Sequence, residues 1–204
     1  MGKAQNKNLK NNSMNDQIIT QIQSNIPASN ESRENVTKWL KSTKDIYRTG
    51  PSNAPFRHIV VYCVLIDPIV EKILLLGHKK SGKLLPAGGH VDIGEDPLHT
   101  SVRELYEETG VREQSLLSHP MSKKLTHLSI TKISGELAHE DVNLYYLFCI
   151  DSKCNDINPQ KYAPHYEEEF TSFDWYDIKT VIEDQTLNTL PEIRDFCQIV
   201  SDNL

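Results

Sequence analysis

Three glutamates crowd into one short predicted helix: Glu104, Glu107 and Glu108, within the stretch PAGGHVDIGEDPLHTSVRELYEETGV that starts at Pro86. Like charges three and four residues apart destabilise a helix by roughly 0.2–0.5 kcal/mol per pair. A bound cation would offset this repulsion, and carboxylate oxygens are ligands suited to Mg²⁺. The alternative is an ordinary solvated face of an amphipathic helix.

The helix that carries these carboxylates has clear boundary signals. Asp96 is a good N-cap, Pro97 suits the first helical position, and Gly110 is a natural stop after the last turn. The sequence therefore predicts a helix over Pro97–Thr109.

Apolar and acidic residues take opposite sides of this helix. At 100° per residue, Leu98, Val102 and Leu105 share one stripe, which must face the core. The three glutamates fall together on the other side, with Arg103 at their margin. A convergent group of carboxylates is therefore expected at one surface.

The loop before the helix is rich in glycine. Gly88, Gly89 and Gly94 permit backbone conformations that other residues avoid, and they allow a close approach to a ligand. A divalent cation held beside this loop would bridge to phosphate oxygens and lower the pKa of a bound water.

The spacing in this stretch resembles the signature of the Nudix hydrolase family. Every fixed position of the Nudix box is filled, in the order Gly89-x5-Glu95-x7-Arg103-Glu104-Leu105-x-Glu107-Glu108-x-Gly110-Val111. A looser resemblance runs from about Phe56 to the C-terminus. It implies an α/β fold of the Nudix type, an α/β/α sandwich with a mixed sheet and a catalytic loop–helix–loop motif.

The resemblance also implies an enzyme. The expected activity is that of a Mg²⁺-dependent pyrophosphohydrolase, with Mn²⁺ as a substitute, which cleaves a nucleoside diphosphate linked to another moiety. A non-catalytic nucleotide sensor on the same fold is the alternative, although a sensor has little need of every catalytic carboxylate. The isomerase branch of the superfamily ranks last, because it usually departs from this box.

Roles carried over by position are expectations for this chain. Glu104 and Glu108 would be the principal metal ligands, Glu107 would contribute directly or through water, and the carbonyl of Gly88 would be a further ligand. Arg103 would orient the glutamates through charge-assisted hydrogen bonds. Glu95 would brace the loop.

Residues outside the acidic helix are further candidates. The general base of the family often precedes a late strand, where HYEEEFTSFDW supplies three glutamates; Glu169 is favoured for its distance from Trp175, against a solvated acidic loop. Substrate contacts are expected from Gly89, His90 and Arg57. His90 could touch a phosphate or brace the loop, and Arg57 could balance phosphates or be solvated.

Three segments are predicted along the chain. Residues 1–13 are rich in Asn and Lys and are expected to form a disordered tail. Residues 14–49 form a helical extension with apolar stripes, which must be buried against the domain itself or against a second subunit in a homodimer. Residues 50–204 form the Nudix domain.

The predicted domain alternates strands and helices. Five strands are expected, in HIVVYCVLID, KILLLGHKK, LTHLSITKI, VNLYYLFCI and FTSFDWYDI, followed by short helices over Ile178–Asp184 and Pro191–Ser201.

Composition limits the partners and the location. The chain has 204 residues and a formal net charge of −6, which argues against nucleic acid or an anionic membrane and leaves a small-molecule nucleotide as the expected partner. The four cysteines form no CxxC pair, and no apolar run approaches the roughly 18 residues of a membrane span, so a cytoplasmic protein is expected. The eight histidines show no HxH or HExxH spacing, and no zinc site is expected.

Overall fold

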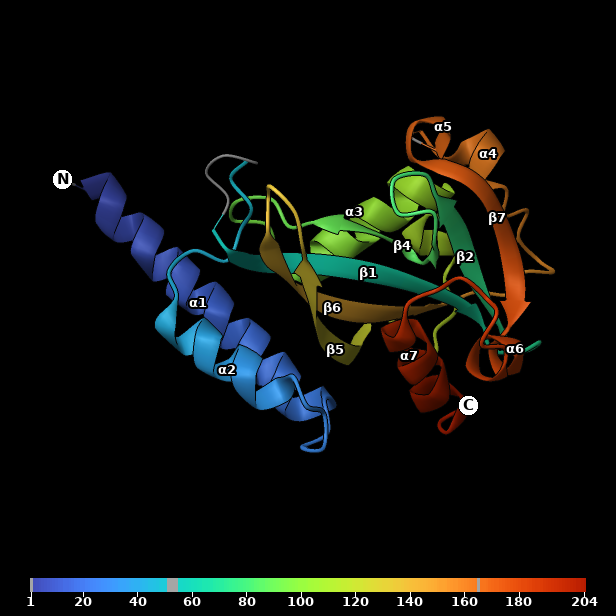
Figure 1. The fold of residues 1–204 in the computed structure, drawn as a ribbon, viewed down its shortest axis with the longest axis horizontal. Coiled ribbons are helices and arrows are strands. Elements are labelled where there is room, and N and C mark those ends of the chain that lie inside the picture. The colour runs from blue at the N-terminus through green and yellow to red at the C-terminus, as the bar shows by residue number, and fades with distance from the viewer. Residues whose placement is uncertain (1, 51–54, 165) are drawn as a thin grey trace.

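The computed structural model describes residues 2–50, 55–164 and 166–204, with side chains from residue 14 onward. In these residues one 7-stranded mixed sheet lies between helices (Figure 1). The strands are β1 (Arg57–Asp67), β2 (Lys72–His78), β3 (Leu84–Leu85), β4 (Ala87–His90), β5 (Lys124–Ile133), β6 (His139–Cys149) and β7 (Phe170–Asp177). The helices are α1 (Gly2–Asn25), α2 (Arg33–Ser42), α3 (Pro97–Thr109), α4 (Pro159–Tyr162), α5 (Tyr166–Glu169), α6 (Ile178–Glu183) and α7 (Pro191–Ser201), with a 3₁₀ turn at Glu113–Ser115.

Strand β1 is the centre of the sheet. The strand order of the sheet is β3-β2-β1-β6-β5. One edge of β1 pairs with β6 in parallel from Arg57 to Ile66. The other edge is shared: β4 pairs with it over Val60–Cys63, and β2 pairs with it only at Ile66 and Asp67. Because β2 and β4 leave β1 at different points, the sheet opens between them.

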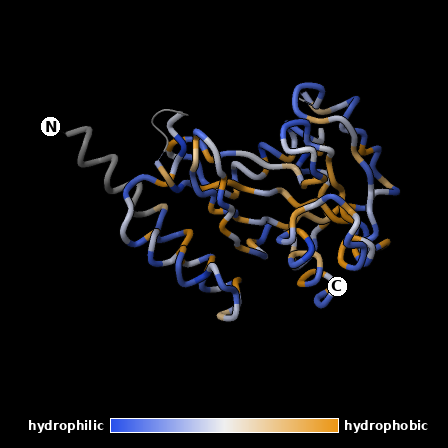
Figure 2. Tube along the Cα trace, in the orientation of Figure 1, coloured by the Kyte–Doolittle hydropathy of each residue, from blue (hydrophilic) through white to orange (hydrophobic). Residues whose placement is uncertain are grey.

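The two faces of the sheet bury different helices. Side chains alternate along a strand, so Ile59 and Val61 of β1 pack into the core with α1, α2 and α3, while Val64 and Ile66 pack against α6 and α7. The apolar segments gather along the central strands in Figure 2. This arrangement confirms the expected α/β/α sandwich.

The helices of the N-terminal extension bury their apolar side chains in the same core as α3, and they lie beside β5 in Figure 1. Ile18, Ile22 and Leu40 are almost fully buried there. The extension is also tied by polar contacts: the Ile59 N–H donates to the Ile46 carbonyl at 2.9 Å. The extension therefore shares one core with the sheet. The predicted disordered tail, residues 1–13, lies outside the residues whose side chains are described and stays a prediction, as do the segment boundaries.

Most predicted elements match, and a few differ. Helix α1 begins at Gly2, before the predicted extension. Within that extension helix α2 ends at Ser42, because Thr43 is extended and its hydroxyl accepts the Asp45 N–H at 3.2 Å, a local alternative to the helix. The glycine-rich loop contains the short strands β3 and β4, and the acidic loop contains the helical turn α5. Among the described helices, none combines the length and the apolar character needed to cross a membrane.

Candidate active site

Helix α3 is fixed at both ends, as its sequence predicts. The Asp96 carboxylate caps the helix by accepting the N–H groups of Leu98 at 2.9 Å and His99 at 3.2 Å. Gly110 ends it in the left-handed conformation, with φ +74°. Leu105 is fully buried in the core under the sheet, so the opposite, acidic side of α3 faces β4 and the opening beside it.

Arg103 binds the carboxylates of the acidic helix together. Its Nη1 atom donates to Glu104 Oε1 at 2.8 Å and to Glu107 Oε2 at 3.0 Å. Its Nε and Nη2 atoms donate to the two oxygens of Glu95, at 3.2 Å and 3.0 Å. The hydrogen bonds to Glu95 raise the pKa of Arg103, so its charge is permanent. The guanidinium thus holds the carboxylates at fixed positions.

Glu108 is the most deeply buried of the three glutamates. It is 5% exposed, and its Oε2 atom accepts the Gly88 N–H at 2.8 Å. Burial raises the pKa of Glu108 to about 9, and the charges of Glu104, Glu169 and Glu107 act in the same direction. Burial also raises the pKa of Glu104. In the absence of a cation, the pocket therefore disfavours the ionised forms of Glu104 and Glu108, and the charge of the neighbouring Arg103 does not offset this effect.

These residues line a cavity of about 500 Å³ at the opening between β2 and β4. Glu169 reaches the cavity from the end of α5, with Oε2 4.0 Å from Nε2 of His78 on β2. The structure thus brings together most of the residues singled out in the sequence, namely Gly88, Gly89, His90, Arg103, Glu104, Glu108 and Glu169, which all line this cavity. Glu107 does not line the cavity, and its Oε2 atom accepts a hydrogen bond from Arg103, which does.

Arg57 lies apart from this group. Its guanidinium forms an ion pair with Glu140, donates to Asn35 Oδ1 at 2.8 Å and stands over the ring of Trp39. It therefore joins β1 to β6 and α2, away from the acidic cavity.

A second, larger cavity of about 810 Å³ adjoins the first. Tyr62, Lys80, His90 and Asp141 line both. Arg48, from the segment after α2, also lines the larger one, and its Nη1 atom lies 2.8 Å from His90 Nε2. Burial and the charge of Arg48 lower the pKa of His90 to about 4.

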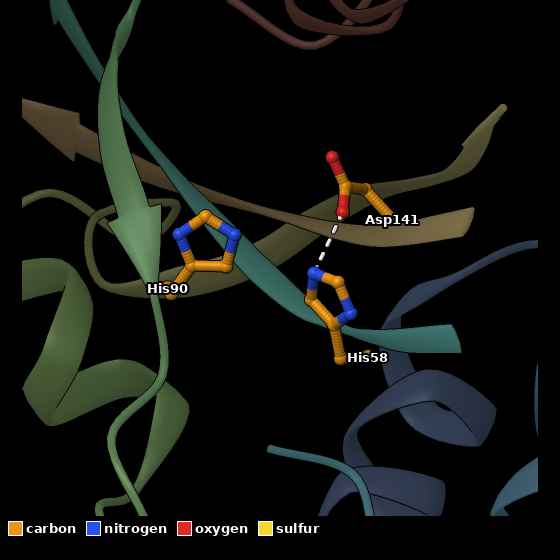
Figure 3. A group of neighbouring side chains, drawn as sticks. All are labelled: His58, His90 and Asp141. Atoms are coloured by element: carbon orange, nitrogen blue, oxygen red, sulfur yellow. Dashed lines mark ion pairs between the residues drawn. The ribbon is translucent and has the colours of Figure 1, made fainter. Parts of the chain in front are cut away.

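Sequence reasoning missed a cluster where the cavities meet. One ligand atom from each of His58, His90 and Asp141 lies within 4.8 Å of the others (Figure 3). No short-range spacing could reveal it, because the three residues belong to β1, β4 and β6. The feature that could have indicated this cluster is the parallel pairing of β1 with β6, which places His58 beside Asp141.

The acidic cavity fits a divalent cation. Three carboxylates lie together, two of them with raised pKa values because burial disfavours their charged forms. A hard cation would supply the missing positive charge, and carboxylate and carbonyl oxygens are its preferred ligands.

Comparison with known proteins agrees with this geometry. A family model described as NUDIX domain matches residues 56–196. A probable DHNTP pyrophosphohydrolase of Lactococcus lactis subsp. cremoris is 24% identical over 140 residues, which cover 69% of this chain and 82% of that protein. An RNA pyrophosphohydrolase of Rhizobium meliloti is 33% identical over 95 residues, 45% of this chain and 56% of that protein.

Solved structures share the fold. The E. coli dihydroneopterin triphosphate pyrophosphohydrolase superposes with a TM-score of 0.55 at 14% identity, over 78% of this chain and 100% of that one. A C. elegans Ap4A hydrolase in a binary complex gives a TM-score of 0.54 at 18% identity, over 71% of this chain and 95% of that one.

Proposed function

Since the chain belongs to the Nudix family and is a hydrolase acting on acid anhydrides, we propose that it cleaves a nucleoside diphosphate linked to another moiety, in a reaction that depends on Mg²⁺. The observation that carries this proposal is the buried acidic group beside β4, in which burial raises the pKa values of Glu104 and Glu108 despite the neighbouring Arg103, so that ionisation of both carboxyls needs a further positive charge.

The residues that would hold Mg²⁺ are Glu104, Glu107 and Glu108, with the carbonyl of Gly88. Mn²⁺ has similar ligand preferences and would substitute. When bound, the ion neutralises phosphate charge and lowers the pKa of a bound water. We also assign Glu107 a second role, the orientation of the attacking water, because its carboxylate is held by Arg103, which lines the cavity.

Arg103 and Glu169 have different roles. Arg103 is a positioning residue, because its bonds to Glu95, Glu104 and Glu107 fix the ligand geometry. Glu169 reaches the same cavity from the opposite side, so its carboxylate is the group we assign to accept the proton of the attacking water.

The two adjoining cavities suit a substrate with two parts. The pyrophosphate group would lie against the acidic cavity, with Gly89 and His90 beside it. The remaining moiety would enter the larger cavity, whose walls include the apolar side chains of Ile133, Leu137 and Leu190. The substrates named for the relatives, dihydroneopterin triphosphate, Ap4A and RNA, share a phosphate chain joined to a bulky group. Arg57 does not line either cavity, and it has no part in this proposal.

The helical extension contributes to the larger cavity through Arg48. We therefore propose that the extension narrows the choice of substrate as well as stabilising the fold.

The net charge of −6 supports a small-molecule nucleotide over a nucleic acid. Three of the four free cysteines are buried, which supports a cytoplasmic location. The buried apolar stripes of the extension lie against the chain's own core, so this proposal needs no homodimer.

A panel assay tests the proposed activity. The full chain is incubated with Mg²⁺ and nucleoside triphosphates, dinucleotide polyphosphates, ADP-ribose, nucleotide sugars and coenzyme A derivatives, and released phosphate or pyrophosphate is measured. Turnover of one class that disappears with chelator supports the enzyme. Tight binding of a panel compound without turnover would instead support the alternative, a nucleotide sensor.

A further inference from the structure

A second group of possible ligands lies on three adjacent strands, apart from the glutamates of α3. His58 of β1 and Asp141 of β6 are direct neighbours in the parallel register. His90 of β4 reaches them from the other edge of β1, where it pairs with Val60. Figure 3 shows the three side chains converging above β1. Because the strands belong to one sheet, the positions of these side chains are fixed.

Two histidines aim their Nε2 atoms toward Asp141, and in their neutral forms these atoms are lone-pair donors. Nδ1 of His58 lies 3.3 Å from the Pro55 carbonyl, and Nδ1 of His139 lies 2.6 Å from the Leu137 carbonyl. A carbonyl only accepts hydrogen bonds, so each Nδ1 carries the hydrogen. In a neutral imidazole Nε2 is then an unprotonated acceptor. Metal-binding histidines are commonly oriented by such a bond to a carbonyl.

Both lone pairs face an oxygen that also accepts. Asp141 Oδ1 lies 3.0 Å from His58 Nε2 and 3.3 Å from His139 Nε2. His58 Nε2 and Asp141 Oδ1 are buried, and neither makes a hydrogen bond of acceptable geometry within the described part of the chain. Two buried acceptors at this distance repel each other, so the contact needs either a proton on Nε2 or a bound cation.

The two distances from Asp141 Oδ1 to Nε2 of His58 and of His139 match the ligand spacing of one small cation, and His90 lies within 4.8 Å of His58 and Asp141. Zinc binds nitrogen and oxygen at about 2.0–2.1 Å in a tetrahedron, which places neighbouring ligand atoms about 3.3 Å apart. Imidazole nitrogen with one carboxylate favours Zn²⁺ over the hard Mg²⁺.

We propose that His58, His90 and Asp141, with His139 as the fourth ligand, form a second cation site that binds Zn²⁺. It differs from the acidic cavity in ligand chemistry and does not depend on the proposed hydrolytic function. Asp141 and His90 line both cavities, which gives the ion a path to the site.

Arg48 competes with the cation at this site. Its guanidinium is always a donor, so His90 Nε2 accepts its hydrogen at 2.8 Å. A zinc ion bound to the same nitrogen must displace this contact. Removal of the guanidinium should therefore tighten zinc binding.

The test uses the full chain, stripped with chelator and then held in excess Mg²⁺ so that the acidic cavity is saturated. Zn²⁺ is titrated by calorimetry, and Co²⁺ is titrated by the visible absorption of its tetrahedral complexes. The variants are Asp141→Asn, His90→Gln and Arg48→Ala. Glu108→Gln and His99→Gln, the latter at an exposed histidine of α3, are the controls.

We expect one equivalent of Zn²⁺ with tetrahedral Co²⁺ spectra in the wild type. Loss of a supporting residue costs about 10–100-fold in metal affinity, so loss of the ligand at Asp141 or His90 should cost at least about 100-fold. The controls should bind as the wild type does, and Arg48→Ala should bind several-fold more tightly.

Three results would overturn the proposal. The first is no zinc binding by the wild type in excess Mg²⁺. The second is unchanged binding by Asp141→Asn, whose amide can still bond to the two histidines and so keep the fold. The third is loss of binding in Glu108→Gln, which would place the zinc among the glutamates of α3. Unchanged or weaker binding by Arg48→Ala would contradict the assignment of His90 Nε2 as a ligand atom.

Discussion

Gly89 of β4 lies directly against the carboxylate of Glu104 on α3: a Cβ atom on Gly89 would stand 2.5 Å from Glu104 Oε1. No other residue type leaves this space open, so the observed position of the Glu104 carboxylate requires glycine at position 89. The neighbouring Gly88 differs, because a Cβ atom there would meet the backbone carbonyl of Val61 on β1.

This difference predicts different outcomes for two alanine variants. In Gly89→Ala the Glu104 side chain can swing away, so we expect a stable protein whose Mg²⁺-dependent activity falls at least about tenfold, since each 1.4 kcal/mol of lost stabilisation costs that factor. In Gly88→Ala the strand backbone must move, so we expect a lower unfolding temperature. Panel kinetics and thermal unfolding measure the two effects. A Gly89→Ala enzyme with wild-type activity would contradict the assignment of Glu104.

The helical extension is expected to be essential for stability. Ile22 of α1 is fully buried against the sheet, and replacing a buried isoleucine by alanine typically costs about 2–5 kcal/mol. Ile22→Ala should lower the free energy of unfolding in urea by that amount. Gln23→Ala changes an exposed neighbour on the same helix and should be nearly neutral. Equal stabilities for the two variants would show that the extension does not share the core.

Asp67 at the end of β1 should make stability depend on acid pH. Burial acts to raise the pKa of its carboxyl, but hydrogen bonds from Ser152, Ile69 and Val70 outweigh it and hold this pKa below its usual value. A lowered pKa in the folded state stabilises the protein above the unfolded pKa of about 3.9, and this stability is lost as the pH falls through the folded pKa.

Asp67→Asn should therefore cost about 1–3 kcal/mol at neutral pH, because the amide keeps only one accepting oxygen. The donors that now reach the other oxygen, such as the N–H of Ser152, then lose their acceptor. The difference from the wild type should shrink below about pH 3.9. Urea unfolding across this pH range measures it, with Asp45→Asn as an exposed control. A difference that stays constant with pH would contradict the assigned charge of Asp67.

Local signals explain what the sequence predicted correctly. Helix α3 has the predicted bounds because Asp96, Pro97 and Gly110 act within one turn of the helix ends. Helix α7, Pro191–Ser201, begins at its predicted proline in the same way. The convergence of the glutamates followed from helical periodicity alone, and α3 and β4 bring them together with Gly88.

Long-range pairing explains what the sequence did not reveal. Strand β4 contains two glycines and forms only because β1 offers it an unpaired edge. The contact of Arg48 with His90 spans 42 positions, and the pairing of His58 with Asp141 depends on the parallel register of β1 and β6. The sequence does not show a partner for Arg57. In the structure Glu140 lies opposite Arg57 in the same register and forms an ion pair with it.

The most direct test of the central claim is the Mg²⁺-dependent kcat/KM of Glu108→Gln on the best panel substrate, beside Glu113→Gln as an exposed acidic control. The amide oxygen at position 108 can still accept the Gly88 N–H, so the fold should be retained, but the side chain can no longer ionise to bind a cation. We predict a fall of at least about 100-fold for Glu108→Gln, in the range seen when one stabilising group is removed from an active site, and wild-type activity for the control. Activity of Glu108→Gln within a few-fold of the wild type at saturating Mg²⁺ would contradict the account.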